Sequence, residues 1–134
     1  MNMMRIPKET PPAPRIDDQL ILARMIWDVA RCGSVREREA IAAVIVNRRR
    51  RDSASLSGLS AEELPDDPRR LRPDLGDMDF DCCRRIARRA IAGVMTDPTN
   101  GAIRYHFVDA CPPWSLGHMP SAWVGDRLFY RMED

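Results

Sequence analysis

The sequence predicts an α+β domain in which three main helices pack with a small antiparallel β element. Apolar residues recur at one-face helical spacing in three segments, near 17–31, 34–46 and 77–96. Two β-like segments follow them, at 102–108 and 123–130. The length of 134 residues suits a single, helix-rich domain of this class.

The first helix is predicted to run from Asp17 to Arg31. Asp17 or Asp18 is the expected N-cap, because a short polar side chain accepts hydrogen bonds from the free N–H groups of the first turn. Gly33 is the expected stop, since glycine readily adopts the conformation that ends a helix. The apolar stripe of this helix consists of Ile21, Leu22, Met25, Ile26, Val29 and Cys32.

The second helix is predicted to open at Ser34. Glu37 stands three residues later, which is the capping-box pattern. The segment 40–46 (AIAAVIV) is apolar almost all round and therefore predicts the central buried helix. Asn47 and the four arginines 48–51 close it, since basic side chains interact favourably with the C-terminal end of the helix dipole.

The third helix is predicted over 77–96, with an apolar stripe on one face and arginines on the other. Before it, residues 52–76 are rich in Ser, Pro and Asp and predict a long loop with at most one short helix near 61–64. After it, the segment 97–101 (Asp-Pro-Thr-Asn-Gly) is a strong turn signal. We therefore expect the chain to reverse there and enter the β element.

Residues 1–16 contain four prolines and are expected to form a disordered or extended arm, with 17–134 as the domain. The arm has no apolar core typical of a signal peptide. No stretch approaches the roughly 20 apolar residues that span a bilayer, so membrane insertion is not expected.

The net charge is only +1, from 21 basic and 20 acidic residues. Such a balance creates no global field that would attract nucleic acid. The arginines of 48–51 and of the third helix suggest nucleic-acid binding only weakly, because no recognition motif accompanies them. We expect a solvated basic face and no nucleic-acid partner.

Neither metal nor cofactor is expected. Cys32, Cys82, Cys83 and Cys111 do not have the spacing of zinc ligands, and the two histidines lack suitably spaced thiols or carboxylates. The adjacent pair Cys82 and Cys83 point to different faces of a helix and cannot easily bond to each other. Buried free thiols are the favoured interpretation.

Four ordered blocks resemble the cell-wall hydrolases of the spore-cortex-lytic (SleB/CwlJ) type. Each block alone is common, but their order and spacing together make the match specific. The blocks are 22–26 (LARMI) leading through Ala30-Arg31, 40–48 (AIAAVIVNR), 85–93 (RIARRAIAG) with the turn 97–102, and Tyr105-His106 with Pro113-Trp114 and 124–131 (VGDRLFYR).

The resemblance implies a lysozyme- or transglycosylase-like catalytic lobe that cleaves peptidoglycan glycan strands as a lytic transglycosylase or muramidase. Such chemistry needs a carboxylic acid that protonates the departing glycosidic oxygen. Counting back from Asn47, the catalytic glutamate of the family falls on Val29. Its second carboxylate falls on Gly33. Neither residue can donate a proton, so the resemblance predicts a degenerate hydrolase.

Asp28 is the candidate substitute acid. It lies one residue before the family position, so its side chain is rotated by about 100° around the helix. The alternative is a surface residue paired with Arg24 or Arg31. Glu37 and Glu39 are the other carboxylates nearby in the sequence, and Glu37 already has a capping role.

Five residues are candidate substrate-binding positions: Tyr105, His106, Trp114, Trp123 and Asn47. Aromatic faces pack well on sugar rings, and the polar side chains can bond to hydroxyl groups. The alternative for Tyr105 and Trp114 is that they anchor the β element on the helices. The alternative for His106 is a structural histidine with satisfied hydrogen bonds.

Two functions follow. The first is a peptidoglycan hydrolase-like domain, bacterial or phage, whose activity is in question because the expected acid is absent. The second is a non-catalytic peptidoglycan-binding or structural component of a phage-derived or secretion assembly, with a protein partner. In either case we expect synthesis in the cytoplasm, followed by delivery to the cell wall or periplasm or inclusion in a phage-like particle.

Overall fold

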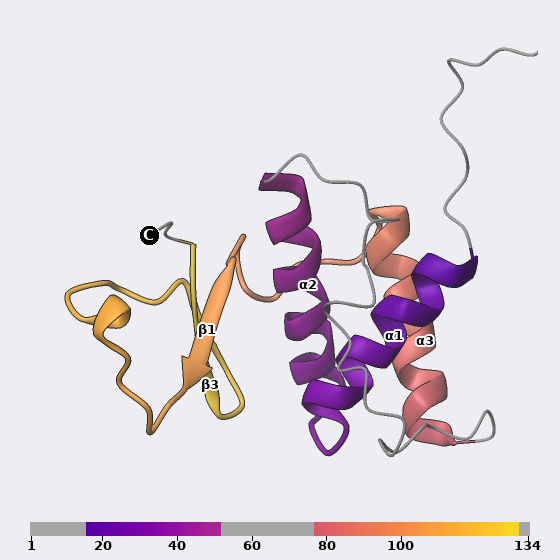
Figure 1. Ribbon diagram of the computed structural model, residues 1–134, viewed down its shortest axis with the longest axis horizontal. Coiled ribbons are helices and arrows are strands. Elements are labelled where there is room, and N and C mark those ends of the chain that lie inside the picture. Colours follow the sequence, from indigo (N-terminus) through magenta and orange to yellow (C-terminus); the bar gives the residue numbers. More distant parts are fainter. Residues whose placement is uncertain (1–15, 52–76, 132–134) are drawn as a thin grey trace, which may run out of the picture.

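The computed structural model describes residues 16–51 and 77–131. Within these ranges the chain forms three α-helices and a three-stranded antiparallel sheet, which confirms the predicted α+β class. Figure 1 shows α2 between the sheet on one side and the pair α1 and α3 on the other. The elements are α1 (Ile16–Ala30), α2 (Val35–Arg51), α3 (Met78–Ala92), β1 (Arg104–Phe107), β2 (Ala122–Val124) and β3 (Arg127–Tyr130).

The start of α2 confirms the predicted capping box. The backbone N–H of Glu37 donates to Ser34 Oγ at 3.2 Å, and the backbone N–H of Ser34 donates to Glu37 Oε2 at 3.3 Å. The start of α1 differs from the prediction, because the helix begins at Ile16 and therefore includes both Asp17 and Asp18. The predicted arm and the predicted loop with its short helix lie outside the described residues.

The end of α3 comes earlier than predicted. Gly93 adopts the left-handed conformation (φ 77°), and its N–H bonds to Ala90 O, so the helix stops at Ala92 rather than Thr96. Its start is as predicted, with Asp77 accepting from the N–H groups of the first turn. The predicted apolar stripe extends past the end of the helix, and Val94, which lies beyond that end, is exposed.

The β element has one strand more than predicted. The segment expected as a single strand over 123–130 is a hairpin, because Gly125 (φ 59°) and Asp126 form a tight turn between β2 and β3. Both outer strands pair antiparallel with β3, which gives the order β1-β3-β2. Phe129 lies opposite Tyr105 on one side and Ala122 on the other.

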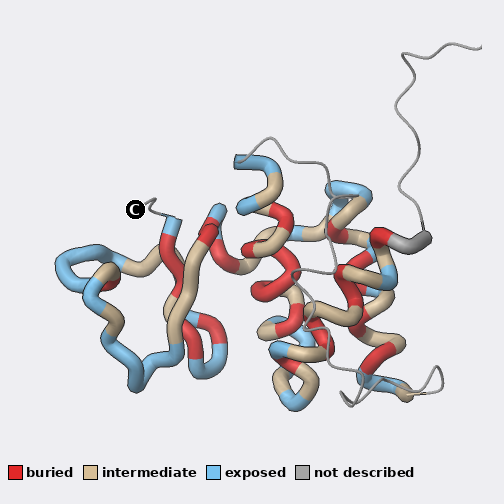
Figure 2. Tube along the Cα trace, viewed as in Figure 1, coloured by how far each residue is buried: buried red, intermediate tan, exposed pale blue. Residues whose placement is uncertain are grey.

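Two apolar clusters hold the layers together (Figure 2). The larger joins the three helices and contains Leu22, Ile26 and Ile86, all fully buried. The smaller joins α2 to the sheet, where Ile41 and other α2 side chains meet Phe129. Helix α2 contributes to both clusters, which explains why its sequence is apolar almost all round.

The four cysteines are free thiols, but the expectation that they are buried holds fully for Cys83 alone. Cys82 is half-buried, and Cys32 and Cys111 are exposed. Burial raises the pKa of Cys83 to about 12, although the Arg38 cation opposes the shift. Cys83 is therefore a core residue without thiolate character.

Candidate functional site

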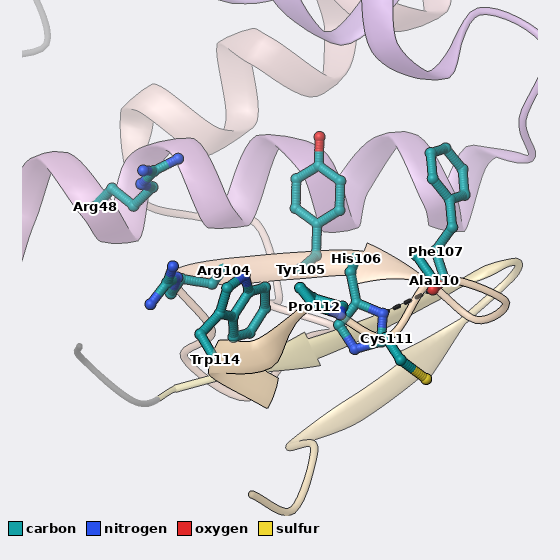
Figure 3. A pocket seen from close by; sticks show the side chains of 9 residues that line it. All are labelled: Arg48, Arg104, Tyr105, His106, Phe107, Ala110, Cys111, Pro112 and Trp114. Atoms are coloured by element: carbon teal, nitrogen blue, oxygen red, sulfur yellow. Dashed lines mark hydrogen bonds between the residues drawn. The ribbon is translucent and has the colours of Figure 1, made fainter. Parts of the chain in front are cut away.

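The candidate residues of β1 lie on different faces of the sheet. Successive side chains of a strand point to opposite faces, so Tyr105 and Phe107 lie on one face and His106 on the other. Figure 3 shows Tyr105 and Phe107 pointing toward α2 and His106 pointing away from it. We call the face toward α2 the inner face and the other the outer face.

A buried arginine connects the inner face to α1. The Arg127 guanidinium lies 5.6 Å from the ring centroid of Tyr105 and 4.6 Å from that of Phe107. Its Nη2 donates to the backbone oxygen of Val29 at 3.1 Å. Within the described residues its buried Nε has no hydrogen-bond partner. The positive charge of Arg127 therefore lies close to two aromatic rings. It also lies beside Val29, the position where the resemblance places an acid.

Val29 is 40% exposed at the last turn of α1. Val29 belongs to the predicted apolar stripe but lies beside the buried face of α1, which contains Leu22, Ile26 and Ala30 and continues to the end of the helix. The side chain instead lies at the surface, where Arg127 ties the end of α1 to β3. The aliphatic side chain of Val29 is accessible to solvent but has no acidic proton to donate.

Asp28 forms the predicted ion pair with Arg24, at 3.6 Å. It is not a surface residue, however, because its side chain is only 8% exposed. The other predicted partner, Arg31, lies over the ring of Trp27 at 4.3 Å. A paired carboxylate with so little accessible surface is poorly placed to reach a sugar.

The carboxylate of Glu37 lies against two glycines. A β-carbon at Gly33 would overlap Glu37 Oε2, and a β-carbon at Gly125 would overlap Glu37 Oε1. The side chain therefore fills the space between the α1–α2 junction and the β2–β3 turn. The capping box explains one of these contacts, but nothing in the local sequence pattern indicates the contact with Gly125.

The outer face holds a closed aromatic cluster. His106 stacks on Tyr130, and Trp114 meets both rings edge-on at centroid distances of 5.5 and 5.2 Å. The two ring nitrogens of His106 lie 2.9 Å from Tyr130 Oη and 2.7 Å from Phe107 O. These contacts give His106 a structural role, and Trp114 anchors the long connection after β1 onto the sheet.

A hollow of about 730 Å³ lies along the free side of β1, and we call it the β1 groove (Figure 3). Its walls come from Arg48 of α2, from residues 104–107, from 110–112 and from Trp114. The volume is within the range of about 300–1,000 Å³ that is usual for small-ligand sites. The groove combines aromatic rings with two cations, Arg48 and Arg104.

Asn47 and Trp123 lie elsewhere. The Asn47 amide donates to Asp97 Oδ2 and to Ala102 O, both at 2.9 Å, and so ties α2 to the turn before β1. Trp123 is 69% exposed on β2 and donates to Gly125 O at 2.9 Å. Of the five predicted binding residues, the structure brings Tyr105, His106 and Trp114 together around the β1 groove.

Sequence reasoning missed Arg127, Phe107 and Arg48. The sequence does contain the information needed to place Arg127. It stands two residues before Phe129 on β3, and residues two apart on a strand point to the same face, here the inner one. Phe107 follows from the same alternation with Tyr105. Arg48 carries no such signal, since only the packing of α2 on the sheet brings it to β1.

Within 16–51 and 77–131, no group of histidines, cysteines and carboxylates is placed to hold a metal ion. No helix in those two ranges has the length and apolar character needed to cross a bilayer.

Comparison with known proteins identifies the fold. The chain is similar to the solved catalytic domain of the Bacillus cereus SleB protein, with a TM-score of 0.63 and 22% sequence identity. The similarity covers 92% of this chain and 96% of that one. No family model and no curated protein matches the sequence. The three helices and the small antiparallel sheet are therefore a SleB-like fold.

Proposed function

We propose that this chain binds peptidoglycan glycan strands in the β1 groove. The observation that carries the proposal is the groove itself, built from aromatic rings and arginines on a fold shared with the SleB catalytic domain. Aromatic rings supply flat apolar surfaces for pyranose rings, and fixed polar groups orient the ligand. The cations Arg48 and Arg104 suit the carboxylates that accompany the sugars in peptidoglycan.

Cleavage with an acid at position 29 is not part of the proposal. Val29 has no proton to donate, and the carboxylate next to it in sequence, Asp28, is shielded and paired. Binding is the part of the hydrolase-like function that the side chains of the groove support directly.

A pull-down with purified sacculi tests the proposal. Phe107 is 49% exposed at one end of the groove, so Phe107→Ala removes binding surface at little cost to the core. Leu116→Ala is the matched control, because it removes an exposed apolar side chain that does not line the groove. Arg48→Ala and Arg88→Ala form a second pair of exposed arginines, inside and outside the groove.

We expect wild type and both controls to be retained on sacculi. Phe107→Ala and Arg48→Ala should each weaken binding about tenfold, which corresponds to about 1.4 kcal/mol. A wild-type protein that stays in the supernatant at high sacculus concentration contradicts the proposal.

A further inference from the structure

We infer that a hollow lined by arginines next to the β1 groove binds a phosphate group carried by the glycan strand. The inference rests on the proposed glycan binding and names a chemical group that the bound strand carries. The hollow has a volume of about 480 Å³, and we call it the arginine hollow. It is lined by Asn47, Arg50, Arg51, Gly101, Ile103 and Arg131.

The arginine hollow adjoins the β1 groove along two elements. Ile103 lines the hollow, and the next residue, Arg104, lines the groove. On α2, Arg51 lines the hollow, and Arg48, about one helical turn earlier, lines the groove. Figure 3 shows Arg48 and Arg104 at the same end of the groove, where β1 begins. Because the two sites share this border, one ligand can occupy both.

Helix geometry and strand pairing bring the arginines to one place. Arg50 and Arg51 follow Asn47 by three and four residues, so the three side chains lie on one face of α2. Arg131 comes directly after β3, and the end of β3 is held to the start of β1 by the bond from Ile103 N to Tyr130 O at 2.8 Å. Residues from the middle and from the end of the chain therefore form one site.

Two glycines support the arginine side chains. The Arg131 stem lies over Gly101, since its Cδ is 3.4 Å from the position that a β-carbon on that glycine would take. Arg50 Nη2 lies 3.8 Å from the corresponding position on Gly93, the glycine that ends α3. Side chains that already rest on the protein lose less conformational freedom when they bind a ligand.

The arginine hollow has an excess of positive charge. The described residues that line it include no aspartate or glutamate. Within 16–51 and 77–131, Arg50 and Arg131 form no ion pair. Guanidinium groups gathered in one hollow repel one another, and a bound anion relieves that repulsion.

The carboxylate of Asp97 lies behind the wall of the hollow but is already engaged. Its Oδ2 accepts hydrogen bonds from Asn47 Nδ2 and Gly101 N, both at 2.9 Å. Its Oδ1 accepts from the backbone N–H and the hydroxyl group of Thr99. Asp97 therefore fixes two residues of the hollow without neutralising its arginines.

The available donors favour a phosphate over a carboxylate. The Asn47 amide donates to Asp97 and Ala102, so the guanidinium groups are the donors that face the hollow. Each guanidinium is a planar fork of N–H groups that fits two oxygens of a phosphate. A carboxylate has two oxygens on one carbon, whereas a phosphate ester has four oxygens around its phosphorus. A phosphate can therefore contact more than one of these arginines at once.

Calorimetric titration of the full chain with inorganic phosphate at pH 7 tests the hollow by itself, with acetate as the comparison anion. We expect saturable binding of phosphate that is tighter than binding of acetate. Arg50→Ala and Arg131→Ala should each weaken phosphate binding about tenfold, because each removes charged hydrogen bonds. Arg88→Ala, on an exposed arginine of α3, and Arg48→Ala, in the groove, are the controls and should bind phosphate as wild type does.

A pull-down then tests whether the glycan strand carries the phosphate. It compares sacculi that bear phosphodiester-linked polymers with the same sacculi after hydrofluoric acid has removed those polymers. Wild type and Arg88→Ala should be retained more strongly on the untreated sacculi. Arg131→Ala should be retained equally on both, because it has lost contact with the phosphate while the β1 groove is unchanged.

The opposite outcomes overturn the inference in separable ways. Absence of phosphate binding, acetate binding of equal strength, or an equal loss in Arg88→Ala overturns the arginine hollow as a phosphate site. Equal retention of wild type on both kinds of sacculi, or stronger retention on immobilised DNA, overturns the glycan strand as the carrier. Wild type that binds phosphate but neither kind of sacculus overturns the proposed glycan binding and leaves the phosphate site standing.

Discussion

The two faces of the small sheet use aromatic residues in opposite ways. On the outer face, His106, Trp114 and Tyr130 contact one another and satisfy their polar atoms within the cluster. On the inner face, Tyr105 and Phe107 lie against the buried Arg127 cation. Rings of both faces line the β1 groove, but His106 and Trp114 are already packed against Tyr130, so their main contribution is to stability, whereas Tyr105 and Phe107 are the rings that we expect to contribute most to binding.

The strongest test of this comparison removes the ring that joins the inner face to α2. Phe129 is almost fully buried among α2 and sheet residues, so Phe129→Ala should lower the free energy of unfolding by about 3–5 kcal/mol. Leu128→Ala, at the half-buried neighbour on the outer face, should lower it by clearly less. Urea denaturation measures both. Equal losses of unfolding free energy in the two variants would show that the inner face contributes no more to stability than the outer face.

A smaller effect is expected at the polar contact that ties α2 to the turn before β1. Asn47→Ala removes both amide donors to Asp97 and Ala102, which should lower the free energy of unfolding by about 1–3 kcal/mol. Burial opposes ionisation of Asp97, but hydrogen bonds from Thr99, Asn47 and Gly101 hold its pKa below the usual value.

The contribution of the Asn47–Asp97 hydrogen bond to stability should also depend on pH. A carboxylate whose pKa is lowered by folding stabilises the protein above its unfolded pKa of about 3.9, and the contribution is lost as the pH falls through the lower folded pKa. The stability difference between wild type and Asn47→Ala should therefore shrink below about pH 4 in urea titrations. A difference that stays constant well below that pH would contradict the charged hydrogen bond.

The smallest effect separates the hydroxyl groups of the two tyrosines. Tyr130→Phe breaks the bond to His106 on the outer face and should lower the free energy of unfolding by about 1 kcal/mol. Tyr105→Phe, on the inner face, should leave stability unchanged and instead weaken retention on sacculi. Loss of stability in Tyr105→Phe, with binding intact, would reverse the assigned roles of the two faces.

Local signals in the sequence were sufficient to predict the start and the burial of α2. The Ser34–Glu37 capping box and the all-round apolar segment 40–46 correctly predicted the start and the burial of α2, because both act within a few residues. The prediction extends α3 beyond Gly93, because the apolar pattern of the helix continues past that glycine. The hairpin was missed because Gly125 and Asp126 interrupt a segment that otherwise alternates like one strand.

The site was only partly predictable. Tyr105, His106 and Trp114 lie together around the β1 groove, and their role in binding stays a prediction; the strand alternation places Tyr105 and His106 on opposite faces of the sheet. Asn47 is also predicted as a binding residue, and in the structure its amide donates to Asp97 and to Ala102. Trp123 was grouped with them by residue type, and its strand places it away from the groove.

The sequence by itself determined the α+β class, the capping box at the start of α2 and the absence of a carboxyl group at position 29, because each depends on residue identity and on neighbours one or two turns away. Only the tertiary structure decided that Val29 is exposed, that Asp28 is shielded and that Glu37 lies between Gly33 and Gly125. The surroundings of Val29 and Glu37 include contacts with residues far away in the chain, such as Arg127 with Val29, 98 positions apart, and Gly125 with Glu37. No local pattern of apolar and polar residues encodes such contacts.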